Sequence, residues 1–157
     1  MATVDSSHNG FSQQYGYFEM AASFPSDPGT WPAFWMLPAN QSQGEGEIDI
    51  IEAYTQFNNA YCANLHDWSN TPNSAQGCPT VNANTLSGYH TYGMLWTAST
   101  MTFYFDGVQV WQHPTLSVMN TPYYMLVDLG IGGGWNTSQT TSPSVMGVKY
   151  VRAYRAP

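Results

Sequence analysis

The sequence is poor in charged residues, and basic residues are the scarcest. Charged residues make up 8% of the 157 residues, and the three basic ones, Lys149, Arg152 and Arg155, all lie in the last nine positions. Nucleic acids and anionic membrane surfaces are both bound by clustered Lys and Arg. We therefore expect neither nucleic acid nor a membrane as a partner, and an uncharged ligand suits the net charge of −7 better.

The sequence also lacks a long apolar run and has only two cysteines. No segment approaches the length of a membrane span, and no signal peptide opens the chain. The start Met1-Ala2 resembles an expression start, so we expect a secreted (extracellular or periplasmic) protein without its targeting segment. Cys62 and Cys78 flank a polar, turn-rich segment, and we predict a disulfide between them. Two unpaired buried thiols are the alternative.

Strand signals dominate, and no segment shows the long 3.6-residue apolar period of an amphipathic helix. Asp106-Gly107 predicts a two-residue hairpin turn, because both positions favour positive φ. With no repeat and no linker, we expect one domain over residues 1–157, folded as an all-β, antiparallel two-sheet β-sandwich. Aromatic and β-branched residues bounded by turn residues predict strands at 15–23, 47–54, 60–66, 90–97, 101–105, 108–112, 123–129 and 145–154.

One predicted strand, Glu47-Ile48-Asp49-Ile50-Ile51-Glu52, carries three acidic residues. Side chains alternate along a strand, so Glu47 and Asp49 share one face while the isoleucines between and after them fill the core. Strict alternation would turn Glu52 inward, which is costly for an unpaired carboxylate. We therefore predict a β-bulge near Ile50-Ile51 that returns Glu52 to the acidic face.

Three carboxylates this close together cannot all ionise at their ordinary pKa values, so at least one must hold a proton at neutral pH. Cleavage of a glycosidic bond needs such a pairing, with a proton donor for the leaving oxygen and an ionised partner for the anomeric carbon. The same spacing also fits a solvated acidic edge that discourages strand pairing, or a cation site built from carboxylates.

The six residues 47–52 resemble the signature of glycoside hydrolase family 16, in the form with one extra residue before the last Glu that is typical of laminarinases and agarases. The resemblance implies a concanavalin-like, two-sheet jelly roll with a cleft on its concave face, and a retaining mechanism. Glu47 would be the nucleophile, Glu52 the acid/base and Asp49 the residue that orients the nucleophile. Retention implies two catalytic carboxyl groups roughly 5–5.5 Å apart. Further matches in the family's order lie at 15–19, 31–38, 90–96, 105–107, 129–133 and 148–152.

Seven further residues are candidates for substrate contact, on the same resemblance and on side-chain type. Flat aromatic side chains bind the apolar faces of sugar rings. We expect Trp31 and Trp135 in loops beside the ligand, whereas Trp35 fits the core equally well. The histidines fit ordinary hydrogen-bonded positions equally well, and they show no zinc spacing, so we expect no catalytic metal. The candidates are Glu19, Trp31, Trp35, His66, His90, Asp128 and Trp135.

Three features depart from the family's pattern. The family has additional strands before the region that matches Thr3 to Tyr15, and their absence leaves exposed sheet edges that favour association with another chain. The family's structural calcium site depends partly on those strands, so we expect no cofactor. Ala21 stands where the family usually has Arg, and Asp128 where it usually has Asn.

The sequence therefore predicts an endo-acting retaining β-glycosidase that hydrolyses β-1,3- or mixed-linked β-1,3-1,4-glucan by double displacement. An agarase or an exopolysaccharide depolymerase remains open within the same class. A carbohydrate-binding or inactive remnant of the fold also remains open, because of the missing strands, Ala21 and Asp128. In that case Trp31 and Trp135 would hold the polysaccharide without cleavage.

Overall fold

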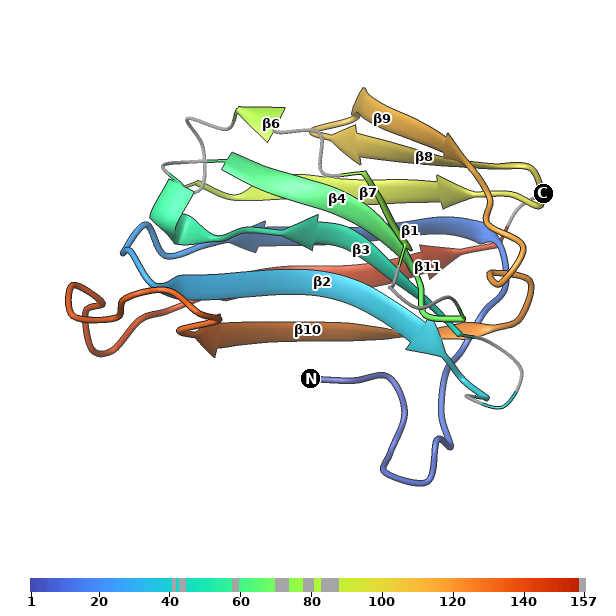
Figure 1. The fold of residues 1–157 in the computed structure, drawn as a ribbon, viewed down its shortest axis with the longest axis horizontal. Coiled ribbons are helices and arrows are strands. Elements are labelled where there is room, and N and C mark those ends of the chain that lie inside the picture. The colour runs from blue at the N-terminus through green and yellow to red at the C-terminus, as the bar shows by residue number, and fades with distance from the viewer. Residues whose placement is uncertain are drawn as a thin grey trace.

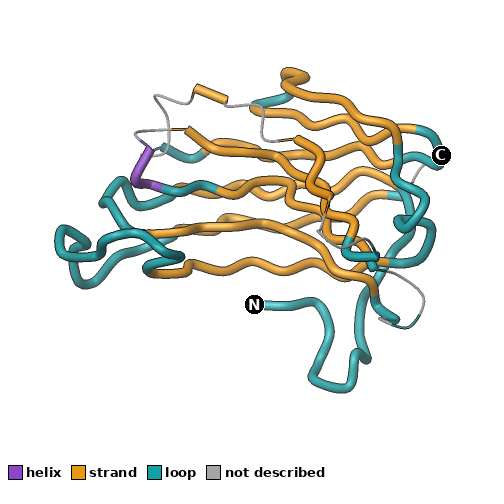
Figure 2. Tube along the Cα trace, viewed as in Figure 1, coloured by secondary structure: helices purple, strands orange, loops and turns teal. Residues whose placement is uncertain are grey.

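The computed structural model describes residues 1–40, 42, 45–57, 60–69, 74–77, 81–82 and 88–155. Within these ranges the chain forms two antiparallel sheets, which confirms the expected all-β sandwich. In Figure 1 strands β2 and β3 of one sheet pass in front of β1 and β11 of the other. Figure 2 shows helix only at the short 3-10 turn η1 (Thr55–Phe57), and no described helix is long and apolar enough to span a membrane.

The two sheets divide the strands as follows. The five-stranded sheet has the order β11 (Gly147–Tyr154), β1 (Gly16–Ser23), β7 (His90–Trp96), β8 (Thr100–Phe105) and β9 (Val108–Pro114). The other sheet has the order β10 (Tyr123–Ile131), β2 (Thr30–Pro38), β3 (Gly46–Glu52), β4 (Ala60–Asp67) and β5 (Ser74–Gly77), with β6 (Val81–Asn82) also paired to β4.

The core lies between the sheets and consists largely of aromatic, methionine and isoleucine side chains. Alternate residues of the central strands point into it, such as Phe18 and Met20 on β1 and Phe34 and Met36 on β2, all fully buried. Burying such side chains is the main favourable contribution to folding, at about 25 cal/mol per Å² of apolar surface. The residues between them point outward, so each sheet also has an outer face that can carry polar side chains.

The predicted hairpin between β8 and β9 is confirmed. Asp106 and Gly107 both have positive φ, 48° and 76°, and Phe105 pairs with Val108 across the turn. Asp is among the residues that adopt positive φ more readily than most. The Oδ1 of Asp106 also accepts the backbone N–H of Thr91 on β7, which ties the turn to the neighbouring strand.

The sequence analysis missed three strands, β2, β5 and β6. Trp31 was expected in a loop, and this is wrong, because it lies in β2 and pairs with Gly130 of β10. Two prolines, Pro32 and Pro38, weaken the strand signal there. Pairing with β10 on one side and β3 on the other nevertheless holds the segment extended.

The two sheet edges formed by β10 and β11 differ. The N-terminal segment crosses β10, where Ala2 bridges Leu126 and Gln13 bridges Tyr123. Strand β11 pairs with β1 and has no second neighbour among the described strands. An open edge of this kind can pair with another chain, so the association expected from the sequence stays a prediction.

Candidate active site

Strand β3 contains the predicted bulge. Asp49 pairs with Asn64 of β4, and Glu52 pairs with Cys62. Two residues of β3 therefore lie between these pairs, opposite a single residue of β4. On the other side, Trp35 of β2 pairs with Asp49 and the adjacent Phe34 pairs with Ile51. Both consecutive isoleucines, Ile50 and Ile51, are buried in the core. The extra residue therefore brings Glu52 back to the face that carries Glu47 and Asp49.

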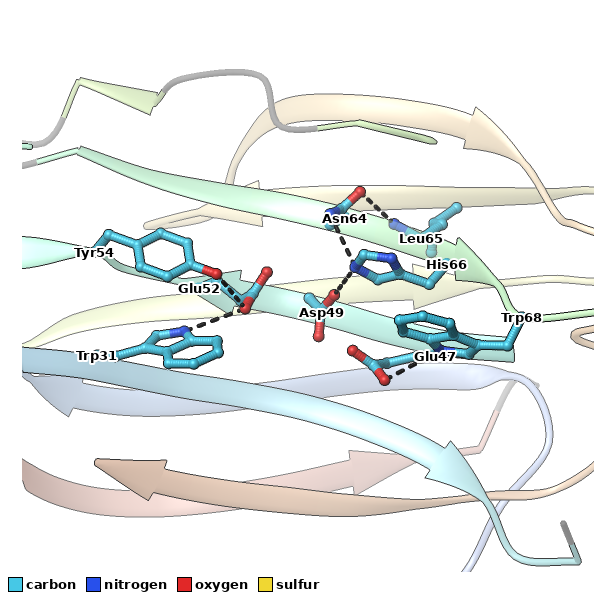
Figure 3. A network of polar contacts seen from close by, with 9 residues as sticks. All are labelled: Trp31, Glu47, Asp49, Glu52, Tyr54, Asn64, Leu65, His66 and Trp68. Atoms are coloured by element: carbon cyan, nitrogen blue, oxygen red, sulfur yellow. Dashed lines mark hydrogen bonds and ion pairs between the residues drawn. The ribbon is translucent and has the colours of Figure 1, made fainter. Parts of the chain in front are cut away.

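The three acidic residues line a hollow on the outer face of the six-stranded sheet. Figure 3 shows them in a row along β3, with His66 on the neighbouring strand β4. An adjoining hollow continues over β4 past Tyr54, Asn64, His66 and Trp68. The first hollow is lined by Trp31, Ala33, Trp35, Glu47, Asp49, Glu52 and Asp128.

Asp49 is the most deeply buried of the three acids. It is 2% exposed, and burial followed by the charges of Glu52 and Glu47 raises the pKa of its carboxyl group to about 7. Its Oδ2 lies 3.2 Å from Nε2 of His66, and this contact raises the pKa of His66. Both shifts favour retention of a proton by the pair into the neutral range.

Asn64 indicates which member of that pair holds the proton. Its Oδ1 accepts the backbone N–H of Leu65, so its Nδ2 faces Nε2 of His66 at 3.0 Å. An amide N–H donor requires a lone pair on Nε2, and an unprotonated Nε2 cannot donate to Asp49. The proton that the pair retains is then on the carboxyl group of Asp49, for which burial favours the neutral form.

Replacement of Asp49 by Asn is expected to stabilise the fold at alkaline pH. Because the folded-state pKa of Asp49 lies above its ordinary value of 3.8, the stability that its neutral form contributes is lost as pH rises from about 4 through about 7. The neutral amide of Asn has no such loss. We expect the melting temperature of Asp49→Asn to match that of the wild type near pH 4 and to exceed it by roughly 3 °C or more at pH 8.

Thermal unfolding followed by circular dichroism across pH 4–8 checks this expectation. Asp128→Asn provides a matched control, because it makes the same change at an exposed carboxyl group of the same hollow. Equal melting temperatures of the wild type and Asp49→Asn at every pH would contradict the assignment of a buried, neutral Asp49.

Glu47 and Glu52 are each held by an indole N–H. Nε1 of Trp68 donates to Oε2 of Glu47 at 3.2 Å, and Nε1 of Trp31 donates to Oε1 of Glu52 at 3.2 Å. The hydroxyl group of Tyr54 also donates to Oε1 of Glu52 at 3.2 Å. Burial raises the pKa of Glu47 above its ordinary value, while the neighbouring His66 and the Trp68 N–H oppose this rise.

Aromatic side chains gather at the Glu52 end of the row. The rings of Trp31 and Tyr54 stack with centroids 5.0 Å apart, and Trp135 packs edge-on against Tyr54 at 6.3 Å and against Phe57 at 4.8 Å. Trp135 lies in the loop after β10, as expected from the sequence. This cluster offers flat ring faces next to the carboxylates.

The remaining predicted groove residues divide between the two sheets. On the six-stranded sheet, Nε1 of Trp35 donates to Oδ1 of Asp128 at 2.6 Å, so both line the hollow and Trp35 is not a core residue. Glu19 and His90 were expected to face the groove, and this is wrong, because β1 and β7 belong to the other sheet. Ala21 also lies on β1, so this departure from the family pattern does not alter the groove.

Glu19 and His90 have structural partners on their own sheet. Glu19 accepts hydrogen bonds from the hydroxyl groups of Tyr17 and Tyr150. Nδ1 of His90 lies 2.6 Å from Oδ2 of Asp106, at the hairpin turn. Glu19 therefore stabilises contacts between strands on the face that points away from the acids. His90 lies two positions before the buried Tyr92 and stacks on Phe105, so it lies at the edge of the core.

Cys62 takes part in a disulfide bond. It lies on β4 opposite Glu52 and lines the second hollow. Its predicted partner, Cys78, lies outside the described residues.

The sequence analysis overlooked Tyr54, Asn64 and Trp68. Tyr54 follows Glu52 by two positions, and Trp68 follows His66 by two, so strand alternation could have placed each beside its neighbour on the groove face. Asn64 precedes His66 by the same interval. The alternation of side chains along a strand, applied to the residues around Glu52 and His66 as well as to residues 47–52, was the signal that could have found them.

Three ligand-type groups are close enough to bind one cation. Single ligand atoms of Glu47, Asp49 and His66 all lie within 4.8 Å of one another. However, Nε2 of His66 already faces the amide donor of Asn64, and Asp49 favours its neutral form. A metal ion needs an unprotonated carboxylate and an open nitrogen lone pair, so this arrangement suits a proton better than a cation.

The chain has the jelly-roll fold, a sandwich of two antiparallel sheets. Its acidic side chains lie on the outer face of one of these sheets. The family model described as Glycosyl hydrolases family 16 matches residues 2–152, and the chain belongs to this family. The chain is 41% identical over 150 residues to endo-1,3-1,4-beta-glycanase ExsH of Rhizobium meliloti (strain 1021), a match that covers 94% of the chain and 32% of ExsH. It therefore spans about a third of the length of this relative.

Two solved structures show the same fold. The laminarinase from Rhodothermus marinus is 26% identical with a TM-score of 0.81, and the match covers 92% of this chain and 67% of the laminarinase. SCLam, described as a non-specific endo-beta-1,3(4)-glucanase, is 26% identical with a TM-score of 0.84 in its E144S mutant, and the match covers 95% of this chain and 64% of that one.

Proposed function

We propose that this chain is the catalytic part of an endo-acting retaining β-glucanase that hydrolyses β-1,3- or mixed-linked β-1,3-1,4-glucan. The observation that carries the proposal is the bulge in β3, which places Glu47 and Glu52 on one face on either side of Asp49. The activities for which the relatives are named, which include endo-1,3-1,4-beta-glycanase and laminarinase, support this substrate class.

The first step would be attack by Glu47 on the anomeric carbon. An oxygen of its carboxylate forms a bond to that carbon while the bond to the leaving oxygen breaks, and Glu52 gives its proton to the leaving sugar. The product is a covalent glycosyl-enzyme. Asp49, neutral and beside both glutamates, adds no third negative charge to the groove.

The second step would reverse these roles. Glu52, now ionised, removes a proton from water, and the water oxygen bonds to the anomeric carbon as Glu47 leaves. Two inversions restore the β configuration. The reaction needs no cofactor, and this fits a trio of Glu47, Asp49 and His66 that favours a proton over a metal ion.

The groove has the chemistry of a neutral sugar site. Trp31, Tyr54 and Trp135 offer ring faces for the apolar sides of sugar rings, and Trp35 is tied to Asp128. An open groove on the outer face of a sheet admits the interior of a long chain, which supports endo cleavage. A polymeric substrate and the disulfide at Cys62 both fit action outside the cytoplasm.

Product analysis on a panel of polymers tests the proposal. We expect reducing sugar from soluble β-1,3-glucan and mixed-linked glucan, with early products several sugars long because cleavage is internal. Larger release from agarose or another galactan would move the enzyme to the agarase alternative. Retardation by glucan in affinity electrophoresis, with no release from any polymer, would overturn the enzyme proposal in favour of a binding module.

A further inference from the structure

We propose that Trp68 is the positioning residue for the attacking carboxylate, because it fixes one oxygen of Glu47 and leaves the other for attack. Its Nε1 donates to Oε2 of Glu47 at 3.2 Å, across the end of the acidic row (Figure 3). The inference rests on the proposed role of Glu47 as nucleophile. It assigns Oε1 as the oxygen that bonds to the anomeric carbon.

Trp68 is held on two sides, so its indole can set the direction of Glu47. Its ring stacks on the imidazole of His66 with centroids 5.1 Å apart and planes 9° from parallel. Its backbone N–H donates to the carbonyl oxygen of Glu45 at 2.7 Å, immediately before β3. His66 in turn contacts Asp49. The ring is therefore anchored to β3 and β4, although its side chain is 50% exposed.

The two glutamates differ in how many donors hold them. Glu52 accepts hydrogen bonds from both Trp31 and Tyr54, whereas Trp68 is the one side-chain donor to Glu47 among the described contacts. Loss of Trp31 would leave a donor on Glu52. Loss of the Trp68 N–H would remove the side-chain hydrogen bond that fixes the rotation of the Glu47 carboxylate.

The indole N–H also affects the charge state of Glu47. A hydrogen bond to the ionised form stabilises that form and lowers the pKa. Burial raises the pKa of Glu47, and the Trp68 N–H opposes this rise. Without the N–H, a smaller fraction of Glu47 is ionised at acid pH. As the pH is lowered, activity is therefore lost at a higher pH than in the wild type.

The test replaces Trp68 by Phe, which keeps a ring over His66 and removes the N–H. We expect the acid limb of the kcat/KM profile to move up by about half to one pH unit, since a net hydrogen bond corresponds to about that shift. KM for glucan is expected to change less than twofold because the ring is retained. The NMR titration of the Glu47 carboxyl carbon is expected to move in the same direction.

Two further samples complete the test. Replacement of Trp68 by 3-benzothienylalanine keeps the two-ring shape without the N–H, so it answers the question if the Phe variant folds poorly. Tyr154→Phe is the matched control, because this exposed aromatic lies on the other sheet, and its profile and titration are expected to match the wild type.

The outcomes separate this inference from the proposed function. An unshifted Glu47 titration and an unshifted acid limb in both Trp68 variants would overturn the positioning role, even if the wild type cleaves glucan. A shifted titration in a protein that cleaves no polymer would support the hydrogen bond's effect on Glu47 and overturn the nucleophile assignment.

Discussion

Replacement of Glu47 by Gly is expected to lower kcat/KM on soluble glucan by about 10⁴-fold or more, the order of loss found when a covalent nucleophile is removed. The small side chain leaves space next to the anomeric carbon. Azide can enter that space and attack a 2,4-dinitrophenyl β-glycoside, forming a bond to carbon as dinitrophenolate leaves. Because this is a single inversion, the expected product is the α-glycosyl azide, identified by NMR.

The unmodified protein provides the control for this experiment. With azide and the same substrate, it should give no α-glycosyl azide, because Glu47 blocks that face of the sugar. A Glu47→Gly variant that keeps a tenth or more of the wild-type activity on glucan would contradict the nucleophile assignment.

Replacement of Glu52 by Gln is expected to reduce kcat/KM on glucan about 10²–10⁴-fold, because the leaving sugar loses its proton donor. A dinitrophenolate leaving group needs no proton, so formation of the glycosyl-enzyme from that substrate should be much less affected. The second step still lacks its general base, and the covalent intermediate should accumulate. Rapid-quench measurement of a dinitrophenolate burst checks this expectation.

Azide distinguishes the two glutamates by stereochemistry. In Glu52→Gln, Glu47 still forms the covalent intermediate, and azide then displaces it from the opposite side. The expected product is therefore the β-glycosyl azide, the opposite anomer from that of Glu47→Gly. The reversed pattern, the β-glycosyl azide from Glu47→Gly and the α-glycosyl azide from Glu52→Gln, would show that the two roles are assigned wrongly. Gln retains the size of Glu, so the contacts of Trp31 and Tyr54 can persist.

The acidic strand could be predicted from sequence because one physical argument left few alternatives. Burying the carboxylate of Glu52 without a partner would be costly, so the chain needed an irregularity between Asp49 and Glu52. The core positions of the isoleucines followed from the same alternation. This local reasoning required no knowledge of which strands are neighbours.

The errors came from contacts between distant segments. Sequence pattern shows that Glu19 and His90 lie in strands, but it does not show to which sheet β1 and β7 belong. Trp31 appeared in a segment with two prolines, and only pairing with β3 and β10 makes that segment a strand. The hydrogen bond from Trp68 to Glu47 likewise depends on the pairing of β4 with β3, which places the residue after β4 beside the start of β3.

The double hydrogen bond to Oε1 of Glu52 has a stereochemical consequence. An oxygen that already accepts from Trp31 and Tyr54 is a poor place for a third hydrogen, so the acidic hydrogen of Glu52 belongs on Oε2. In the proposed reaction, the leaving glycosidic oxygen would then receive its proton from the side of Oε2. Trp31 and Tyr54 would thus restrict protonation of the leaving sugar to one lateral trajectory.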